Sequence, residues 1–346
     1  MRLPKIDMFV VGLAAMVGLA ILWPEGGRTG GLLHWDYVTT YGICGVFFLY
    51  GLTLAPERMR AGLTRWKAHI AVVIATFGLF PAVVLAAEWA FPHLLPKPAM
   101  IGFFYVAALP STVSSSVAMV SLAKGDVPVA IFNATLSALL GVFITPALMA
   151  WYMQTSGAPV PLLPTILKVV LLVLLPIIVG QVARHWLAGW AKAHSGFIKR
   201  ADRAIILAIV YGAFSNSVHD GVWVRNDPSI VAEIAAGTIA LFAVVYTLTI
   251  AIAAVLKMDR GEAIAVKFCG SKKSLATGVP LAPVIFAGRP DLGLIILPIM
   301  LFHFFQLLIV STIATRMSKA ADEAPAAQTA PVAETTISTA AADQSR

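Results

Sequence analysis

The sequence contains little charge and little cysteine. Of its 346 residues only 12% are charged and two are cysteine, whereas 59% are hydrophobic and the mean hydropathy is +0.86. This composition excludes an ordinary soluble domain and is typical of a protein that crosses a membrane several times. Cys44 and Cys269 both fall within apolar runs, so they indicate buried side chains and imply no disulfide framework.

Sequence signatures of catalysis and of nucleotide hydrolysis are also absent. The chain contains no Walker A loop, no Gly-x-Ser-x-Gly, no paired catalytic carboxylates and no Cys/His metal-binding spacing. These absences argue against an enzyme and against an ATP-driven pump, and the only cofactor to consider is Na+ or H+ as a coupling ion. The net charge of +8 lies in short Lys and Arg clusters between apolar runs, which favours lipid headgroups over nucleic acid as the partner.

Ten apolar segments are long enough to be read as membrane spans, which need ~20 residues each. Their approximate limits are 8–23, 38–55, 68–90, 99–122, 127–152, 162–186, 203–220, 230–256, 263–287 and 292–316. The first is interpreted as a retained helix, because bulky residues follow it where a signal peptidase would need small ones. We therefore predict an all-α polytopic membrane domain over residues 1–319 and, because residues 320–346 have almost no large apolar groups, a disordered cytoplasmic tail.

The loop charges predict the orientation of these spans. With the N-terminus inside, sixteen Lys and Arg residues fall on the inner side. The outer side holds only Arg28, Lys97, Arg225 and Arg289, with Lys168 near an outer helix end as a fifth. This bias predicts a multi-pass protein of the cell membrane with both termini in the cytoplasm.

Two of the apolar segments are interrupted by proline, glycine and polar residues. The fourth contains Leu-Pro-Ser-Thr-Val-Ser-Ser-Ser (109–116), and the ninth contains Gly-Ser-Lys-Lys-Ser-Leu-Ala-Thr-Gly-Val-Pro (270–280), at an offset of 161 residues. Each interruption is fourth in a set of five segments, so the two halves, about 8–152 and 162–316, would cross the membrane in opposite senses. Interrupted helices at matching positions of inverted halves indicate the binding site of a transporter.

The interruptions supply the candidate binding residues. A broken helix exposes carbonyls and hydroxyls that suit alkali cations, and half-helix N-termini that suit anions. The hydroxyl set is Ser111, Thr112, Ser114, Ser115, Ser116, Ser271, Ser274 and Thr277. A single hydroxyl of this kind would more often bond only to a preceding carbonyl of its own helix.

Lys272 and Lys273 lie within the second interruption. A charge at the bilayer centre costs ~3 kcal/mol, so we expect one ammonium to enter the crossing of the two helices and the other to meet a water-filled vestibule or a carboxylate. The alternative is that both lysines snorkel near an interface. Asn133, and His303 with Gln306 three residues later, are further polar candidates because they fall in apolar segments and would bond a neighbouring helix.

Four motifs resemble the bile acid:sodium symporter superfamily, and within it the branch related to solute carrier family 10 member 7. They are Leu-Pro-Ser-Thr-Val-Ser-Ser-Ser-Val-Ala (109–118), Ala-Lys-Gly-Asp-Val-Pro (123–128), Gly-Ser-Lys-Lys-Ser-Leu-Ala-Thr-Gly-Val-Pro-Leu (270–281) and Leu-Phe-His-Phe-Phe-Gln-Leu (301–307). The resemblance covers residues 5 to 317. It implies ten helices in a five-plus-five inverted repeat, a panel domain, and a core domain in which discontinuous helices four and nine cross.

The chain departs from that family at the sodium ligands. The acidic residue and the Gln that bind sodium on helix nine of the bile acid branch fall on Phe268 and Lys272, and two helix-five hydroxyls fall on Ala130 and Ala134. Ser116 retains a hydroxyl, so Ser114, Ser116 and Ser271 stay as candidates for a Na+ site. A fixed ammonium in place of the bound ion would remove the need for sodium.

Two functions follow from these residues. The first is a secondary transporter of a small, anionic organic solute by alternating access, nominally coupled to sodium but with the sodium ligands replaced. The second is a non-transporting membrane sensor or regulatory protein that binds a solute in the same cavity. The sequence does not indicate the substrate, the coupling ion, the direction of transport, the oligomeric state or the role of the tail.

Overall fold

The computed structural model describes residues 8–53, 64–92, 94–155, 162–227 and 229–323, and all regular elements in these ranges are helices. The helices before the interruption at 109–116 are α1 (Met8–Leu22), α2 (Pro24–Gly27), α3 (Trp35–Thr53), α4 (Trp66–Ile74), η2 (Ala75–Leu79), α5 (Phe80–Ala90) and α6 (Lys97–Ala108). They are followed by α7 (Ser114–Leu122), α8 (Val127–Thr155), α9 (Leu162–Val169), η3 (Val170–Leu174), α10 (Leu175–Ala193), α11 (Ser195–His219), α12 (Ile230–Val255), α13 (Arg260–Gly270), α14 (Leu275–Ile285) and α15 (Leu292–Glu323).

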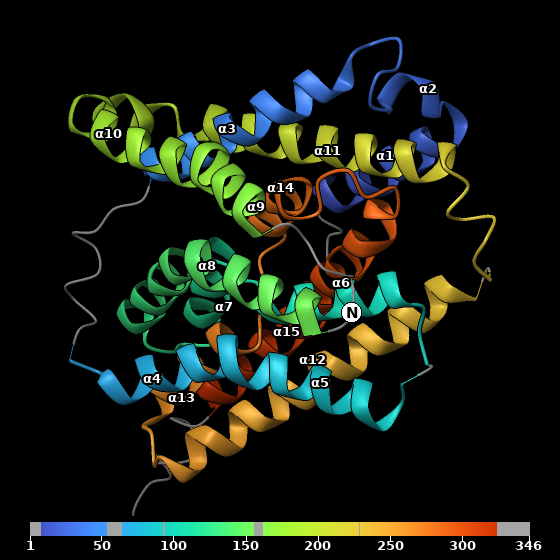
Figure 1. The fold of residues 1–346 in the computed structure, drawn as a ribbon. Coiled ribbons are helices and arrows are strands. Elements are labelled where there is room, and N and C mark those ends of the chain that lie inside the picture. Colours follow the sequence, from blue (N-terminus) through green and yellow to red (C-terminus); the bar gives the residue numbers. More distant parts are fainter. Residues whose placement is uncertain (1–7, 54–63, 93, 156–161, 228, 324–346) are drawn as a thin grey trace, which may run out of the picture.

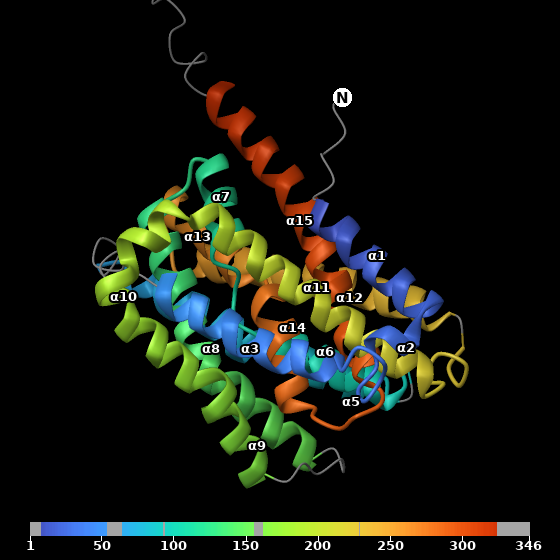
Figure 2. The ribbon, with the colours of Figure 1, turned by 90° about the horizontal axis from the view of Figure 1, so that it is seen from above.

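Within the described residues each of the ten predicted apolar segments lies mainly in helix, and five helices there are long and apolar enough to cross a membrane. These are Trp66–Ala90, Val127–Thr155, Leu167–Ala193, Ile230–Val255 and Leu292–Ala321. Two predicted limits were wrong. The loop expected between the sixth and seventh segments, over 187–202, is mostly helical, because α10 and α11 meet at His194. The last helix, α15, continues through residues 320–323 of the predicted tail. Residues 324–346 lie outside the described residues, and Figure 2 shows α15 projecting past its neighbours.

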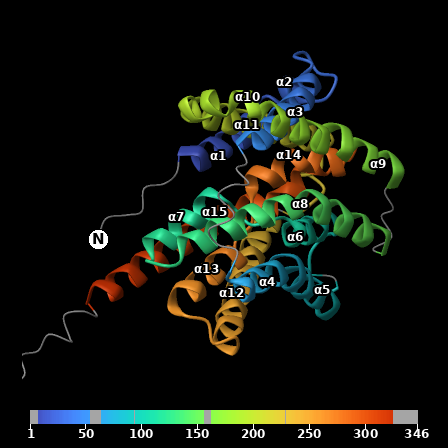
Figure 3. The ribbon, with the colours of Figure 1, turned by 90° about the vertical axis from the view of Figure 1, so that its left-hand side faces the viewer.

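The helices form two groups, which Figures 1 and 3 show from two sides. We call α1, α2, α3, α10 and α11 the panel group; they pack against one another along the upper part of Figure 1. We call α4 to α8, α12, α13 and α15 the core group; there α15 packs on α6 and α12, and α13 packs on α4, α7 and α8. The α14 helix lies between the groups and contacts α11 and α15.

The panel group contains a close helix crossing built on glycine. A Cβ added at Gly51 of α3 would lie 2.2 Å from the carbonyl oxygen of Ile177 on α10, and one at Gly180 of α10 would lie 2.2 Å from the carbonyl oxygen of Phe48 on α3. Gln181 adds a hydrogen bond of 2.7 Å from Nε2 to the carbonyl of Gly51. Small residues that let two backbones approach are the usual means by which membrane helices associate.

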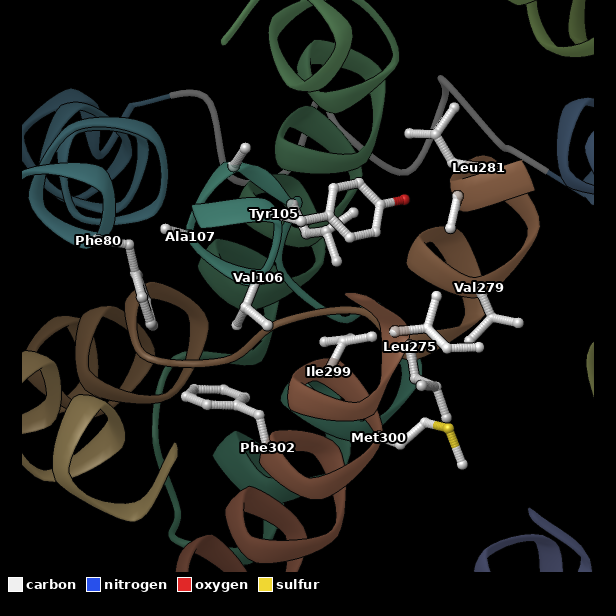
Figure 4. Packing of buried hydrophobic residues seen from close by; sticks show 14 of the residues in the cluster. Phe80, Tyr105, Val106, Ala107, Leu275, Val279, Leu281, Ile299, Met300 and Phe302 are labelled. Atoms are coloured by element: carbon white, nitrogen blue, oxygen red, sulfur yellow. The ribbon is translucent and has the colours of Figure 1, made fainter. Parts of the chain in front are cut away.

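The core group is packed with buried aromatic and aliphatic side chains (Figure 4). The rings of Phe80 and Phe302 meet edge to face with centroids 5.9 Å apart. Tyr105 is fully buried, and its hydroxyl donates to the carbonyl of Gly278 on α14 at 2.7 Å, which satisfies the polar end of a ring in an apolar surrounding. This packing fixes α6 and α14, the helices that lead into and out of the two interruptions.

A short π-helix, η2, precedes Pro81 in the core group. In η2 the N–H of Phe80 donates to the carbonyl of Ala75, five residues earlier. The next carbonyl in that pattern, Thr76, would face the nitrogen of Pro81, which has no N–H. Thr76 therefore has a buried carbonyl that needs a partner from elsewhere in the chain.

Candidate functional site: the crossing of two broken helices

The first break separates α6 from α7. Pro110 has no N–H and disfavours helical backbone at the residue before it, and Leu109 accordingly adopts φ −70° and ψ 153°. The last carbonyls of α6 thereby lose their helical partners. Thr145 of α8 donates its hydroxyl to one of them, Ala108, at 2.7 Å, and the N–H of Ser111 that would have reached Ala107 donates to Ser137 Oγ at 2.9 Å.

The second break separates α13 from α14. Ser271 and the residues after it leave the helical path, and Ser274 takes an extended conformation with φ −88° and ψ 108°. The hydroxyl of Ser274 accepts from the N–H of Thr277 at 3.2 Å, so Ser274 is the N-cap of α14. A serine at this position restarts the helix within four residues of its interruption.

The two breaks are joined to each other through their backbones. The N–H of Ser274 donates to the carbonyl of Pro110 at 2.9 Å, and the hydroxyl of Ser111 donates to the carbonyl of Cys269 at 2.6 Å. Both Ser111 and Ser274 are buried. Groups freed by one interruption therefore satisfy groups freed by the other, as a chain without access to water requires.

Lys273 provides the central charge of this crossing. Its Nζ lies 2.7 Å from each of three carbonyl oxygens, those of Thr76, Ala107 and Leu109. These are the carbonyls orphaned by the π-helix before Pro81 and by the end of α6. We call them the carbonyl cage; Lys273 lies in it with no exposed surface.

The geometry of the carbonyl cage indicates a charged amine. Three acceptors at hydrogen-bond distance need three N–H donors, which an ammonium has and a neutral amine lacks. The ammonium also lies over the face of the Phe80 ring, with Nζ 4.1 Å from the ring centroid. Such a cation–π contact contributes ~2 kcal/mol when it is shielded from water. The cage thus offsets the cost of burying the charge without a carboxylate.

Gln306 of α15 holds the backbone of Lys273 in place. Its Oε1 accepts from the Lys273 N–H at 2.9 Å, and its Nε2 donates to the Lys273 carbonyl at 2.8 Å. Nε2 also lies 2.9 Å from Nδ1 of His303. Of the two polar residues that the sequence placed on one face of the tenth segment, Gln306 therefore meets the second break directly, and His303 bonds to Gln306.

Lys272 differs from its neighbour in the partners of its ammonium. It is equally buried, but its Nζ donates to the hydroxyl of Ser115 at 2.8 Å, the one hydrogen bond recorded for it among the described residues. Ser115 in turn donates to Thr112 Oγ1 at 2.8 Å, and Thr112 shares a hydrogen bond of 2.8 Å with Ser116. Lys272 thus lies beside a chain of three hydroxyls at the N-terminus of α7.

The structure places the Lys273 ammonium in the crossing, as expected for one of the two lysines, and differs from the other expectations for the pair. Among the described residues neither ammonium meets a carboxylate, and neither reaches a vestibule or snorkels, because both side chains are fully buried and bond to groups of the first break. The two charges are solvated differently: Lys273 bonds to three backbone carbonyls, whereas Lys272 bonds to the hydroxyl of Ser115.

Other candidate residues lie apart from this cluster. Ser114 is exposed, Ser271 donates to the carbonyl of Lys267 in its own helix, and Thr277 is half-buried beside Ser274. Asn133 is buried on α8, and its hydrogen bonds go to His69 Nδ1 at 3.1 Å and to the carbonyl of Val129. The three hydroxyls proposed as Na+ ligands, Ser114, Ser116 and Ser271, therefore make no hydrogen bond to one another.

Several residues that build the crossing were missed by sequence reasoning. They are Thr76, Phe80, Tyr105, Ser137 and Thr145, of which Thr76 and Phe80 act through a carbonyl and a ring face. Pro81 inside the third apolar segment was the available signal for an orphaned carbonyl near residue 76. Pro110 was the corresponding signal for the carbonyls of Ala107 and Leu109, but a backbone carbonyl has no side-chain signature, so the sequence does not show that the three converge.

A second polar region lies between the two helix groups, at the predicted outer end. This outer pocket has a volume of about 420 Å³, within the range of small-molecule sites, and α3 and α11 face the segment from Pro283 to Leu292 across it. It contains Asp36, Asp220 and Arg289. Arg289 forms two hydrogen bonds to Asp291, at 2.9 and 2.6 Å, whereas Oδ1 of Asp36 is buried with no hydrogen-bond partner among the described residues.

The fold and this site define a class of protein. Apolar helices of membrane length, two broken helices that meet at buried charges, and a pocket between two helix groups together describe a multi-pass membrane transporter.

Comparison with known proteins specifies the family. The model of the SBF-like CPA transporter family matches residues 7–319, and the chain belongs to this family, within the bile acid:sodium symporter group that its motifs resemble. The chain is 38% identical to the uncharacterized protein PA2026 of Pseudomonas aeruginosa, over 93% of this chain and 96% of that protein. It is 33% identical to YfeH of Escherichia coli, which is named as a candidate symporter, over 93% and 96%, and 26% identical to the sodium/bile acid cotransporter 7 of Rattus norvegicus, over 89% and 91%.

Proposed function

We propose that the protein is a secondary transporter of a small organic anion, which works by movement of the core group against the panel group. The observation that carries this proposal is the buried Lys272 ammonium at the N-terminus of α7. The relatives named as a symporter and as a sodium/bile acid cotransporter support transport as the function of this family.

Lys272 has the features of an anion-binding group. Its ammonium has three N–H donors, and one of them is used by Ser115. The first N–H groups of α7 have no partner within their helix and carry the positive end of its dipole. An anion at this point would meet a charge, free N–H groups and the hydroxyls of Thr112 and Ser115 together.

The arrangement of the two helix groups supports alternating access. The crossing is built by α6, α7 and α13 of the core group and the start of α14, whereas the outer pocket is lined by α3 and α11 of the panel group and by the segment from Pro283 to Leu292. A shift of one group against the other would widen or close that pocket without breaking the hydrogen bonds of the crossing. The proposal includes ten spans in a five-plus-five inverted repeat, with N- and C-termini in the cytoplasm and the protein in the plasma or inner membrane.

Uptake of radiolabelled organic anions into proteoliposomes tests the function. The full chain should concentrate or equilibrate at least one anion of a panel that includes a bile acid, a dicarboxylate and an aromatic carboxylate. Lys272→Met should reduce that uptake at least about 10-fold, because it removes the charge and keeps the apolar volume. Lys267→Met, on α13 five residues earlier and with a half-buried side chain, is the matched control and should retain uptake.

The alternative, a non-transporting sensor, predicts a different result in the same experiment. Anion binding to the purified protein, measured by its thermal stability, would then depend on Lys272 while the proteoliposomes show no flux. Removal of residues 320–346 would change signalling to a partner and leave binding intact. Flux that depends on Lys272 excludes this alternative.

A further inference from the structure

The carbonyl cage around Lys273 has the composition of a site for a monovalent cation. Backbone carbonyls of an unwound membrane helix are the groups that replace the water shell of an alkali ion in transporters and channels. Here the carbonyls of Thr76, Ala107 and Leu109 converge on one point with equal distances of 2.7 Å. The charge at that point belongs to the protein itself.

We propose that the Lys273 ammonium is a built-in cation that takes the place of a bound Na+, so that this protein folds and works without sodium. The cage is complete, because its three carbonyls satisfy the three N–H donors and the Phe80 ring closes it on another side. A second cation at this point would meet the fixed charge at contact distance and would have no free oxygen of the cage to bind.

A tethered cation has a consequence for coupling. Na+ that binds a transporter from one side and leaves on the other transfers the energy of its gradient, whereas an ammonium on a side chain cannot leave. The Lys273 charge therefore stabilises the crossing of the broken helices in every state and supplies no energy for transport. This inference takes its location from the proposed transport site, but it concerns cation binding and is testable without any solute.

The experiment uses the full-length purified protein and three variants: Lys273→Ala, Lys273→Met and, as a control on α13 six residues earlier, Lys267→Ala. Thermal unfolding is measured in NaCl, methylammonium chloride and choline chloride at equal ionic strength, and binding of ²²Na+ is measured in parallel. The wild type and Lys267→Ala should have the same Tm in all three salts and should bind no ²²Na+ at the cage.

Lys273→Ala empties the cage and should lower the Tm in choline by roughly 5 °C or more, because three buried carbonyls lose their donors. NaCl or methylammonium chloride should restore part of that loss, and ²²Na+ should now bind, since a cation that binds only the folded state stabilises it. Lys273→Met should be equally destabilised in all three salts, because its side chain occupies the cage without charge.

Two results would overturn the proposal. The first is a wild-type protein that has a higher Tm in NaCl than in choline chloride and that binds ²²Na+, with this binding lost in Lys273→Met. The other is a Lys273→Ala protein that folds but gains nothing from either small cation. If both Lys273 variants fail to fold, the wild type still decides, because equal stability in the three salts supports the built-in cation and a sodium requirement excludes it. Absence of uptake for every anion would contradict the proposed function and leave these readouts unchanged.

Discussion

The crossing of the broken helices and the outer pocket are both polar regions of an apolar protein, yet they satisfy their polar groups differently. At the crossing, Lys273 and Gln306 are fully buried; the Lys273 ammonium bonds to three backbone carbonyls, and Gln306 bonds to the backbone of Lys273. In the outer pocket, Arg289 pairs with Asp291 at a partly exposed position, and Asp36 keeps one oxygen without a partner in the described part of the chain. One region is solvated by the protein and the other in part by water.

This difference separates groups that maintain the fold from groups that are free to meet a solute. A buried donor or acceptor that loses its partner costs the full desolvation penalty, whereas a charge at a wet surface exchanges one partner for water. Substitutions at the crossing should therefore change stability, and those in the outer pocket should change access. Four substitutions test this contrast, in order of decreasing effect on stability.

Gln306→Leu should have the largest effect. It removes the partners of both the N–H and the carbonyl of Lys273 in a fully buried place. At about 1–3 kcal/mol for each orphaned group, we expect a loss of roughly 2–6 kcal/mol and a marked decrease in the Tm of the purified protein. The control is Gln154→Leu on the exposed face of α8, which should leave the Tm nearly unchanged. Equal Tm values for the two variants would show that Gln306 does not hold the second break.

Ser137→Ala should have an intermediate effect. Its hydroxyl accepts from the buried N–H of Ser111, and the loss of this acceptor leaves one orphaned group at a cost of about 1–3 kcal/mol. Thermal unfolding should show a decrease smaller than that of Gln306→Leu, with exposed Ser121→Ala as the control. Faster hydrogen exchange at Ser111 than in the wild type would locate the change at the first break.

These two residues also show how far the sequence predicts the site. Gln306 was predicted because a glutamine within an apolar segment indicates a helix-to-helix hydrogen bond. Ser137 was not, because a serine in a membrane helix usually bonds to its own backbone, and the sequence does not show which serine faces an orphaned N–H. The positions of the breaks were predictable from proline and from charge in apolar runs.

The partners of the two lysines could not be predicted from the sequence. The carbonyls that surround Lys273 come from a π-helix and from the end of α6, and a backbone carbonyl is common to every residue. From the resemblance, the ammonium expected to replace a bound sodium ion was that of Lys272, which aligns with a sodium-binding Gln of the bile acid branch. In the structure the carbonyls surround Lys273 instead. A panel and a core were expected from the resemblance alone, because the sequence carries no periodic signal for the long-range packing of its apolar helices.

Arg289→Gln should have a small effect on stability, since it breaks an ion pair that is partly exposed and contributes about 0–1 kcal/mol. It removes a positive charge from a pocket whose lining also includes Asp36 and Asp220, and it leaves the neighbouring Asp291 without this partner. If an organic anion enters here, its KM for uptake should rise, and the rise should shrink at high salt because of screening. A KM that is independent of salt would place the entry route elsewhere.

Asp36→Asn should have the smallest effect on stability and is the sharpest test of the contrast. Its buried oxygen has no hydrogen-bond partner among the described residues, so replacing the carboxylate by an amide breaks no bond recorded there. The Tm should stay the same or rise, and anion uptake should improve because one negative charge leaves the pocket. A Tm loss as large as that of Ser137→Ala would mean that Asp36 has a structural partner in the native membrane, and the two regions would then follow the same rule.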